Sequence, residues 1–366
     1  MRGSLFVVPV LLCAQALAQQ APRLVSPEVS AKREVTFRFR SPNAKEVLLS
    51  REGATRVPMT RDEAGVWSVT VGPLEPDYYG YSFIADGVAY IDPVNGLMKP
   101  NILSPQSMVL VPGETPLIWE TRNVPRGGVH HHFYKSGVIG DNRDYYVYLP
   151  PSYDGKKKLP VLYLLHGFSD DASGWTSVGQ AHVILDNLLA EGKMDPTIVV
   201  MTLGYGAPEI LRSTSATRPP DVQRRNREAY RDALFNEVIP AVEKTYKVDA
   251  RREKRAIAGL SMGGGQTLFI GLNHLDRFAY IGAFSSGIGS DNPAQLWPTL
   301  DAGASAKIRK FWIACGKDDF LIEPNRKFHA WLNEKGVKHD WVETEGAHTW
   351  LVWRRYLAQF APMLWK

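Results

Sequence analysis

Residues 255–267 read RAIAGLSMGGGQT, and this stretch decides the fold class. A short apolar run leads into G-x-S-x-G, the pattern in which a serine occupies a sharp turn between a buried strand and a helix. Taken alone the pattern is weak, because a chain with so many glycines shows it by chance about one time in ten. Its context is more specific, since strand-like residues precede Ser261 and small residues follow it. The stretch predicts an α/β protein with a serine nucleophile on the turn.

Apolar runs and helical patterns alternate on both sides of this turn. Four runs are too continuous for half-exposed strands and favour a parallel sheet that is buried on both faces. These runs are 160–165, 197–201, 255–258 and 310–315. Helical patterns lie at 181–191, 227–246, 262–273, 325–335 and 350–364. The alternation predicts a mostly parallel, doubly wound α/β domain at 129–366.

The first half of the chain has a different pattern. Short alternating runs at 34–40, 46–49, 65–71 and 79–84 are separated by proline and glycine and show no helical period. Such runs indicate a small, immunoglobulin-like antiparallel β-sandwich. We expect this module at 19–112, followed by a linker at 113–128 that is rich in proline, threonine and glycine.

The first eighteen residues resemble a secretory signal peptide. Arg2 precedes an apolar run at 5–12, and Ala16-Leu17-Ala18 forms an A-x-A cleavage signal. Cys13 raises the alternative of a lipoprotein anchor, although Leu12 stands where a small residue would be expected. We therefore expect a secreted or periplasmic protein, and the sequence leaves open which of the two. Cleavage after Ala18 would leave Cys315 as the single cysteine, so no internal disulfide is expected.

Composition excludes several other classes. Hydrophobic residues make up 44% of the chain and charged residues 22%, which suits a folded protein with a sizeable core. The net charge of +5 is small for 366 residues, and no long Lys/Arg block occurs, so nucleic-acid binding is not expected. No apolar segment is long enough to span a bilayer. The oligomeric state stays open.

A serine nucleophile needs a base to accept its proton and a carboxylate to orient that base. In this architecture the chain order is serine, acid, histidine. Asp319 follows the buried run 310–315, and His348 follows the strand-like residues 339–343, so both lie on loops at the carboxyl ends of strands. The oxyanion would be bound by the backbone N–H groups of Met262, next to the serine, and of Phe168, after an earlier strand.

These motifs together resemble carbohydrate esterase family one, the feruloyl esterase, esterase D and enterochelin esterase group. The matching stretches are 143–151, 164–167, 259–264, 315–319 and 346–348. The resemblance implies an α/β-hydrolase fold in which Ser261, Asp319 and His348 are nucleophile, orienting acid and base. The stretches 65–67 and 86–93 are more weakly similar to early-set, glycogen-binding-like modules that precede such esterases.

Other readings of these residues are structural. Ser261 could be an ordinary turn residue, and His348 could cap the last helix. The run 130–132 is three histidines, but successive residues in a strand point to opposite faces, so a metal site is not expected there. Cys315 reads as a small core residue. Trp67 and the nearby tyrosines fit the core of a sandwich, and the arginines at 218–231 fit a solvated helix face.

We therefore expect a serine esterase that acts without a metal or organic cofactor. The preferred substrate would be a feruloyl or related hydroxycinnamoyl ester of plant cell-wall carbohydrate, with Trp175, Tyr205 and Arg212 as substrate contacts. Acetyl xylan esterase and enterochelin or other siderophore esterase are alternatives, and an acyltransferase is a further one. A protein of a different class, a non-catalytic carbohydrate-binding protein, would lack turnover of a simple ester.

Overall fold

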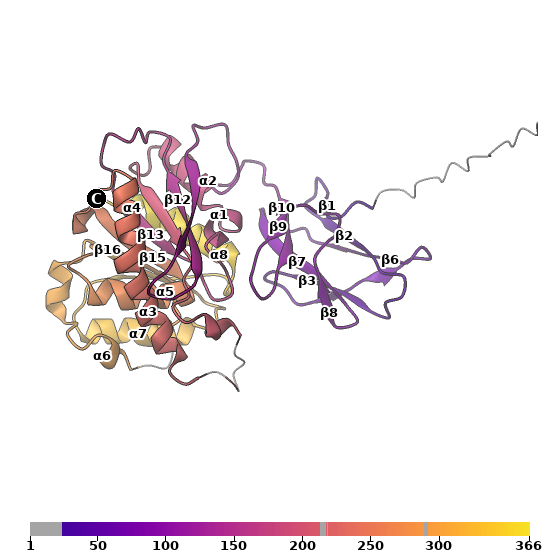
Figure 1. Ribbon diagram of the computed structural model, residues 1–366. Helices are drawn as coiled ribbons and strands as arrows, with labels where there is room; N and C mark the ends of the chain where they lie inside the picture. Colours follow the sequence, from indigo (N-terminus) through magenta and orange to yellow (C-terminus); the bar gives the residue numbers. More distant parts are fainter. Residues whose placement is uncertain (1–23, 213–216, 218, 289–291) are drawn as a thin grey trace, which may run out of the picture.

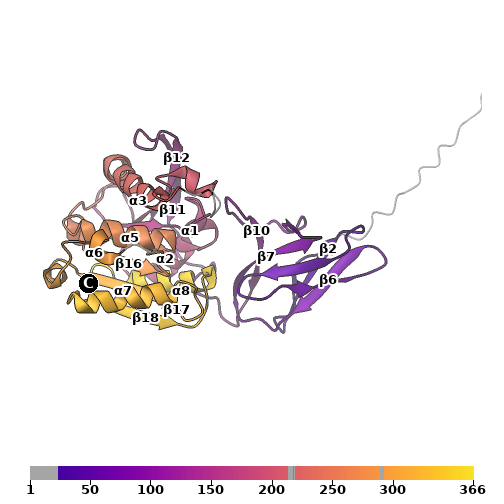
Figure 2. The ribbon, with the colours of Figure 1, turned by 90° about the horizontal axis from the view of Figure 1, so that it is seen from below.

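The computed structural model describes residues 24–212, 217, 219–288 and 292–366. The predicted signal segment, residues 1–18, lies outside these ranges, as does Arg218. Two parts of different architecture lie side by side, a β-module in indigo and an α/β part in the remaining colours (Figures 1 and 2). In the described part of the chain no helix combines the length and apolar character needed to cross a membrane.

The β-module consists of two antiparallel sheets packed face to face. One has the strand order β1-β2-β6-β5, and the other has the order β4-β3-β7-β10-β9 with β8 paired to β7. The strands are β1 Glu28–Val29, β2 Val35–Arg40, β3 Val47–Arg51, β4 Val57–Pro58, β5 Thr60–Arg61, β6 Val66–Val71, β7 Asp77–Ala85, β8 Val88–Tyr90, β9 Met98–Lys99 and β10 Gln106–Val111.

The core of this module follows from the alternation of its strands. In β2, Val35, Phe37 and Phe39 are buried, while the residues between them are partly exposed. These three side chains pack between the sheets against residues of β3, β7 and β10, including Tyr81 and Phe83. Alternating burial of this kind produces a sandwich, as the sequence pattern predicts.

The α/β part is built on one sheet with the order β11-β12-β14-β13-β15-β16-β17-β18. Strands β11 and β12 are antiparallel, and the other six run parallel to one another. The strands are β11 Gly128–Lys135, β12 Asn142–Leu149, β13 Val161–Leu165, β14 Ile198–Thr202, β15 Arg255–Leu260, β16 Tyr280–Phe284, β17 Lys310–Gly316 and β18 Asp340–Thr344.

Helices cover both faces of this sheet (Figure 1). Leu162 and Leu164 of β13 pack toward α1, α2 and α8, while Val161, Tyr163 and Leu165 pack toward α3, α4, α5 and α7. The helices are α1 Gly174–Ser177, α2 Ala181–Ala190, α3 Val222–Ala233, α4 Ile239–Thr245, α5 Met262–Asn273, α6 Pro293–Leu296, α7 Ile322–Glu334 and α8 Trp350–Phe360. Shorter turns are η1 Pro208–Leu211, η2 Leu234–Val238, η3 Arg252–Lys254, η4 Ala302–Ala306 and η5 Ala361–Met363.

The predicted helix at 227–246 is only partly correct. Helix α3 begins at Val222, five residues before the predicted start, and the π-helical turn η2 separates it from α4. Its buried positions Val222, Asn226 and Tyr230 recur every four residues. Asn226 is polar and four arginine or acidic residues lie between these positions, so the sequence shows no clear apolar face. Strand β16, Tyr280–Phe284, was not predicted from the sequence.

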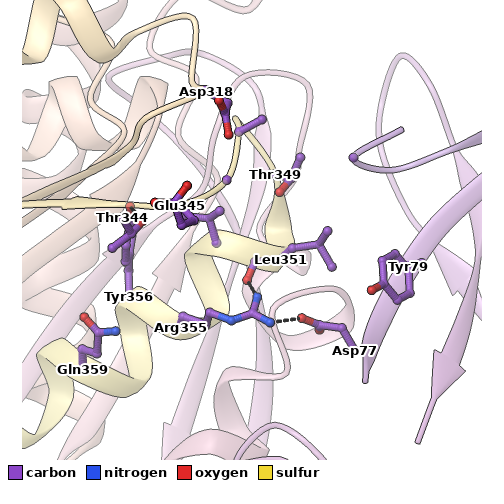
Figure 3. A pocket seen from close by; sticks show the side chains of 14 residues that line it. Asp77, Tyr79, Asp318, Thr344, Glu345, Thr349, Leu351, Arg355, Tyr356 and Gln359 are labelled. Carbon is purple, nitrogen blue, oxygen red and sulfur yellow. Dashed lines mark hydrogen bonds and ion pairs between the residues drawn. The ribbon is translucent and has the colours of Figure 1, made fainter. Parts of the chain in front are cut away.

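Helix α8 makes the main contact between the two parts. The buried guanidinium of Arg354 donates from Nη1 to Asp77 Oδ1 at 2.9 Å and from Nε to the carbonyl of Val178 at 3.0 Å. Arg355 pairs with the other oxygen of Asp77 at 2.8 Å (Figure 3). Leu351 packs against the apolar core of the module. The module is therefore held beside the loops at the carboxyl ends of the parallel strands.

Candidate active site

Ser261 occupies a strained turn between β15 and α5. Its φ and ψ are 53° and −116°, a conformation that side chains rarely adopt. A Cβ atom at Gly259 would lie 2.6 Å from the backbone of Gly263, and one at Gly263 would lie 2.4 Å from the carbonyl oxygen of His166. Only glycine fits both positions, which is why the motif contains them. The turn projects Ser261 from the end of the sheet.

A continuous chain of hydrogen-bonding groups runs from Ser261 to Asp319. Ser261 Oγ lies 2.9 Å from Nε2 of His348, and Nδ1 of the same ring lies 2.9 and 3.0 Å from the two carboxylate oxygens of Asp319. The His348 ring is further packed by Trp353 and by Phe320, whose centroids lie 4.8 and 4.4 Å away. The three residues predicted from chain order are thus brought together.

Asp319 is held as an anion. Burial raises the pKa of this carboxyl, but hydrogen bonding and charge attraction from His348, together with the N–H of Leu321 at 2.8 Å, bring the net pKa below its usual value. The adjacent Asp318 is exposed and lines a different cavity, of about 730 Å³, between the module and α8 (Figure 3). The two neighbouring acids therefore face different surroundings.

The loop after β13 is fixed by His166. This buried ring accepts a hydrogen bond from the N–H of Gly204 at Nε2, at 2.9 Å, and Nδ1 lies 2.7 Å from the carbonyl of Gly167. These partners require the neutral tautomer with the proton on Nδ1. Burial lowers the pKa of His166 to about 4, so the ring keeps this form near neutral pH. The Gly167 carbonyl precedes the Phe168 N–H, which is therefore held in place.

Two cavities meet at Ser261, and Phe168 lines both. The cavity of about 430 Å³ has one apolar wall, formed by Ile210, Met262, Phe320 and Leu321 together with Phe168. Polar residues line the rest of it, among them Gln223, Asn226, Arg227 and Gln266. We call it the apolar cavity. The other, of about 230 Å³, contains His348 and is lined on one side by polar residues of the β-module. We call it the polar cavity.

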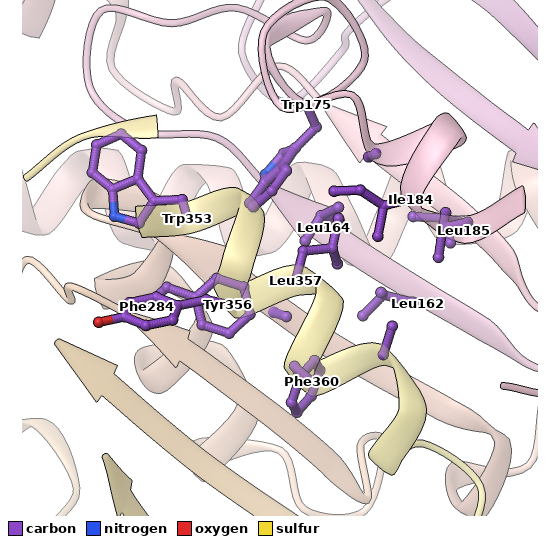
Figure 4. Packing of buried hydrophobic residues seen from close by; sticks show 14 of the residues in the cluster. Leu162, Leu164, Trp175, Ile184, Leu185, Phe284, Trp353, Tyr356, Leu357 and Phe360 are labelled. Atoms are coloured by element: carbon purple, nitrogen blue, oxygen red, sulfur yellow. The ribbon is translucent and has the colours of Figure 1, made fainter. Parts of the chain in front are cut away.

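Two of the predicted substrate contacts are wrong. Trp175 is fully buried between the sheet and α8, where its indole N–H donates to the carbonyl of Leu165 at 2.9 Å (Figure 4). Tyr205 is 2% exposed, and its hydroxyl donates to the carbonyl of Asp170 at 2.8 Å. Both side chains therefore stabilise the loop around His166 from inside the protein and do not face a substrate. Arg212 is exposed after η1, and the described residues that line the two cavities do not include it.

The histidines at 130–132 lie in the edge strand β11. His130 and His132 both contact the hydroxyl of Tyr246, while His131 lies on the opposite face and pairs with Asp144 at 2.7 Å. Within the described residues, no three His, Cys, Asp or Glu side chains are grouped so that they could hold a metal ion. The arrangement of the run follows from the alternation of a strand.

Sequence reasoning missed the contribution of the β-module to this site. Five module residues line the polar cavity: Glu52, Lys99, Asn101, Ser104 and Gln106. They lie in the turn after β3, in β9, in β10 and in the loop between β9 and β10, more than 150 residues before Ser261 in the chain. No local motif marks them. Phe320 was missed as well, although its place next to Asp319 was a usable signal.

Most of this chain is similar to a known esterase. An endo-1,4-beta-xylanase/feruloyl esterase of Xylanibacter ruminicola is 30% identical over 349 residues, which cover 93% of this chain and 46% of that protein. The chain thus spans less than half of that relative.

Solved structures show the same architecture. A ferulic acid esterase of Anaeromyces mucronatus in complex with ferulic acid has 25% identity and a TM-score of 0.59, over 67% of this chain and 93% of that one. The enterobactin esterase of Shigella flexneri shares the fold over 91% of this chain and 92% of its own, with a TM-score of 0.67 and 20% identity.

The family model described as Esterase matches residues 136–364, which include Ser261, Asp319 and His348. This match covers more than half of the chain and the whole α/β part from the end of β11 onward. The chain therefore belongs to the esterase family.

Proposed function

We propose that this esterase hydrolyses carboxylic esters of carbohydrate through an acyl-enzyme, with a hydroxycinnamoyl group such as feruloyl as the preferred acyl part. The observation that carries the proposal is the chain of hydrogen-bonding groups from Ser261 through His348 to Asp319, placed where the two cavities meet. A serine hydroxyl activated in this way attacks an ester carbonyl.

The reaction proceeds in two stages. In the first, Ser261 Oγ attacks the carbonyl carbon, its proton passes to Nε2 of His348, and the N–H groups of Phe168 and Met262 bind the oxyanion. His348 then gives the proton to the leaving alcohol, and an acyl-serine ester remains. In the second, His348 accepts a proton from a water molecule whose oxygen attacks the acyl carbon. His348 then returns the proton to Ser261 Oγ as the carboxylic acid is released. Asp319 keeps the imidazole oriented throughout.

The preference for an aromatic acyl group is supported by the apolar cavity. Phe168 and the exposed Phe320 stand on its wall beside Met262 and Leu321. Aromatic rings gain about 1 kcal/mol beyond the area they bury when they pack against another ring. An acetyl group has no ring to pack against these side chains. The feruloyl esterases among the similar proteins support the same acyl class.

The test is a comparison of kcat/KM for methyl ferulate, acetylated xylan and a catecholate siderophore. We expect the ferulate ester to be preferred over acetyl esters by about tenfold. A preference for acetylated xylan or for the siderophore would replace the proposed acyl class with that one. No turnover of any ester by the intact chain would favour a non-catalytic carbohydrate-binding protein.

We also propose that the protein is exported and cleaved after Ala18. Support comes from Arg2, the apolar run at 5–12 and the A-x-A signal. Plant cell-wall esters lie outside the cell, so export suits the proposed substrate. Fractionation followed by N-terminal sequencing would test this, with Gln19 expected as the first residue of the exported protein.

A further inference from the structure

The β-module forms one wall of the polar cavity. Lys99 ends β9, Gln106 begins β10, and the loop between these strands carries Asn101 and Ser104. The opposite wall is formed by residues of the α/β part, among them Ser261 and His348. Any molecule that fills this cavity therefore touches both parts of the protein at once.

Acid–base chemistry decides which half of an ester this cavity receives. His348 must deliver its proton to the oxygen of the leaving alcohol, so the alcohol has to lie on the same side of Ser261 as the imidazole. The polar cavity contains His348 in its lining, whereas the lining of the apolar cavity contains Met262 and Phe320. The alcohol therefore enters the polar cavity, and the acyl group the apolar one.

The module wall carries one positive and one negative side chain, Lys99 and Glu52, which pair with each other. Lys99 Nζ lies 3.1 Å from Glu52 Oε2, and both side chains are largely buried, with exposures of 12% and 6%. Burial raises the pKa of Glu52. Attraction to Lys99 and Arg354 and hydrogen bonds from two backbone N–H groups outweigh this effect, so the pKa lies below its usual value. The pair is thus an ammonium beside a carboxylate. A charged alcohol would be repelled by one member of this pair and attracted by the other, so the wall does not favour a charged alcohol.

The remaining polar groups suit hydroxyls. Ser104 presents a hydroxyl, and Gln106 presents an amide, each able to donate and to accept. A Cβ atom at Gly80 would lie 2.8 Å from Lys99 Cδ and 3.0 Å from Gln106 Oε1, so this glycine makes room for both side chains. Trp350 and Trp353 also line the cavity, but their side chains are buried, with exposures of 2% and 6%. Side chains that both donate and accept hydrogen bonds match the hydroxyls of a sugar ring.

The module wall is fixed to the oxyanion loop. Asn101 Nδ2 donates to Ser169 Oγ at 3.0 Å and to Asp170 Oδ1 at 3.1 Å, and the N–H of Ile102 donates to the carbonyl of Ser169 at 2.7 Å. On the other side, Glu52 Oε1 accepts a hydrogen bond from the N–H of Trp350 at 2.9 Å, two residues after His348. The wall therefore keeps one position relative to the reacting atoms.

We propose that the β9–β10 edge of the module, with Lys99, Ser104 and Gln106, is the alcohol-binding half of the active site and receives a neutral, hydroxyl-rich leaving group such as a pentose unit. This assignment rests on the proposed ester hydrolysis at Ser261. It gives the module a direct part in substrate selection.

The experiment compares two esters with the same acyl group, methyl ferulate and 5-O-feruloyl-arabinofuranose. Gln106→Leu removes hydrogen-bonding groups at nearly constant volume, and we expect kcat/KM for the sugar ester to fall about tenfold while methyl ferulate is turned over as before. Ser104→Trp places an indole in the polar cavity from an exposed loop position. We expect the same selective loss, by tenfold or more.

A matched variant fills the other cavity. Gln223 lines the apolar cavity from an exposed position of α3, so Gln223→Trp should lower kcat/KM for both ferulate esters by the same factor. Lys45→Met, at an exposed position on the same module, should change neither. Thermal melting of each variant reports whether the fold is retained.

Selective loss with the sugar ester in Gln106→Leu and Ser104→Trp supports the assignment. Equal losses with both esters, or no loss with either, would overturn it. The outcome for the proposed function is separate: if the wild-type chain does not hydrolyse methyl ferulate, the hydroxycinnamoyl preference fails. The same pair of variants is then compared on methyl and sugar esters of the acyl group that is turned over.

Discussion

The two parts of this protein contribute to one active site in different ways. The α/β part carries Ser261, Asp319 and His348 and the two proposed oxyanion donors, so every proposed reacting group comes from a single sheet. The β-module supplies no such group, yet it contacts the loops of both His348 and Phe168 and lines one cavity. The contrast teaches that the proposed reacting groups and the proposed alcohol-binding wall lie in different parts of the chain, so the choice of alcohol can be altered separately from the reaction.

The largest effect is expected at the nucleophile. Ser261→Ala should lower kcat by about 10⁶, because the histidine and carboxylate cannot act without a nucleophile. The melting temperature should change little, since the hydroxyl contributes little packing. Ester turnover and thermal melting measure the two quantities. Substantial remaining activity would remove Ser261 from the mechanism and the α/β part from its role as the source of the chemistry.

The next effect distinguishes the neighbouring acids. Asp319→Asn should lower kcat by about 10⁴, because an amide no longer holds the imidazole in the required tautomer. Asp318→Asn is the matched control, and it should have a mild effect because Asp318 lines a different cavity. Steady-state kinetics on methyl ferulate would show the ranking. A larger loss in Asp318→Asn would reverse the assignment.

The largest effect on the free energy of unfolding is expected at the ion pair between Asp77 and Arg354, which joins the two parts. Asp77→Ala leaves the buried Arg354 without its carboxylate, and we expect a loss of about 3 to 5 kcal/mol in the free energy of unfolding. Urea denaturation measures this value. Glu75→Gln, on a largely exposed side chain nearby, should change it by less than about 0.5 kcal/mol. An unchanged stability in Asp77→Ala would mean that the module rests only loosely on α8.

The smallest effect concerns Asp170, which touches both parts. Burial raises the pKa of this carboxyl to about 7, although Lys99 and Asn101 oppose the shift. Because the folded-state pKa is raised, the stabilisation is complete below the usual pKa of 3.8 and is lost as the pH rises through about 7. Relative to the wild type, Asp170→Asn should therefore become more stable by about 3 kcal/mol between pH 4 and pH 8.

Unfolding curves of both proteins at these two pH values test the sign. A constant difference in stability would show that Asp170 titrates normally and that the module does not shield it from water.

Most of the fold and the grouping of Ser261, Asp319 and His348 were predictable from sequence, because each has a local signal. The glycines around Ser261 are required by backbone contacts a few residues away, and Asp319 and His348 follow strand-like runs. Trp175 and Tyr205 were misassigned because an aromatic residue in a loop has the same sequence signature whether it faces a substrate or supports the loop from inside. The module wall was missed because contacts such as that between Asn101 and Asp170 join distant segments and leave no periodic pattern.

The long sequence separation between the module and α8 has a consequence for biosynthesis. Asp77 is made 277 residues before its partner Arg354, and Glu52 is made 298 residues before its partner Trp350. The module cannot dock on α8 until these partners have been made. A chain cut before His348 would lack both this residue and the docked module, so such truncated products are expected to be inert toward esters.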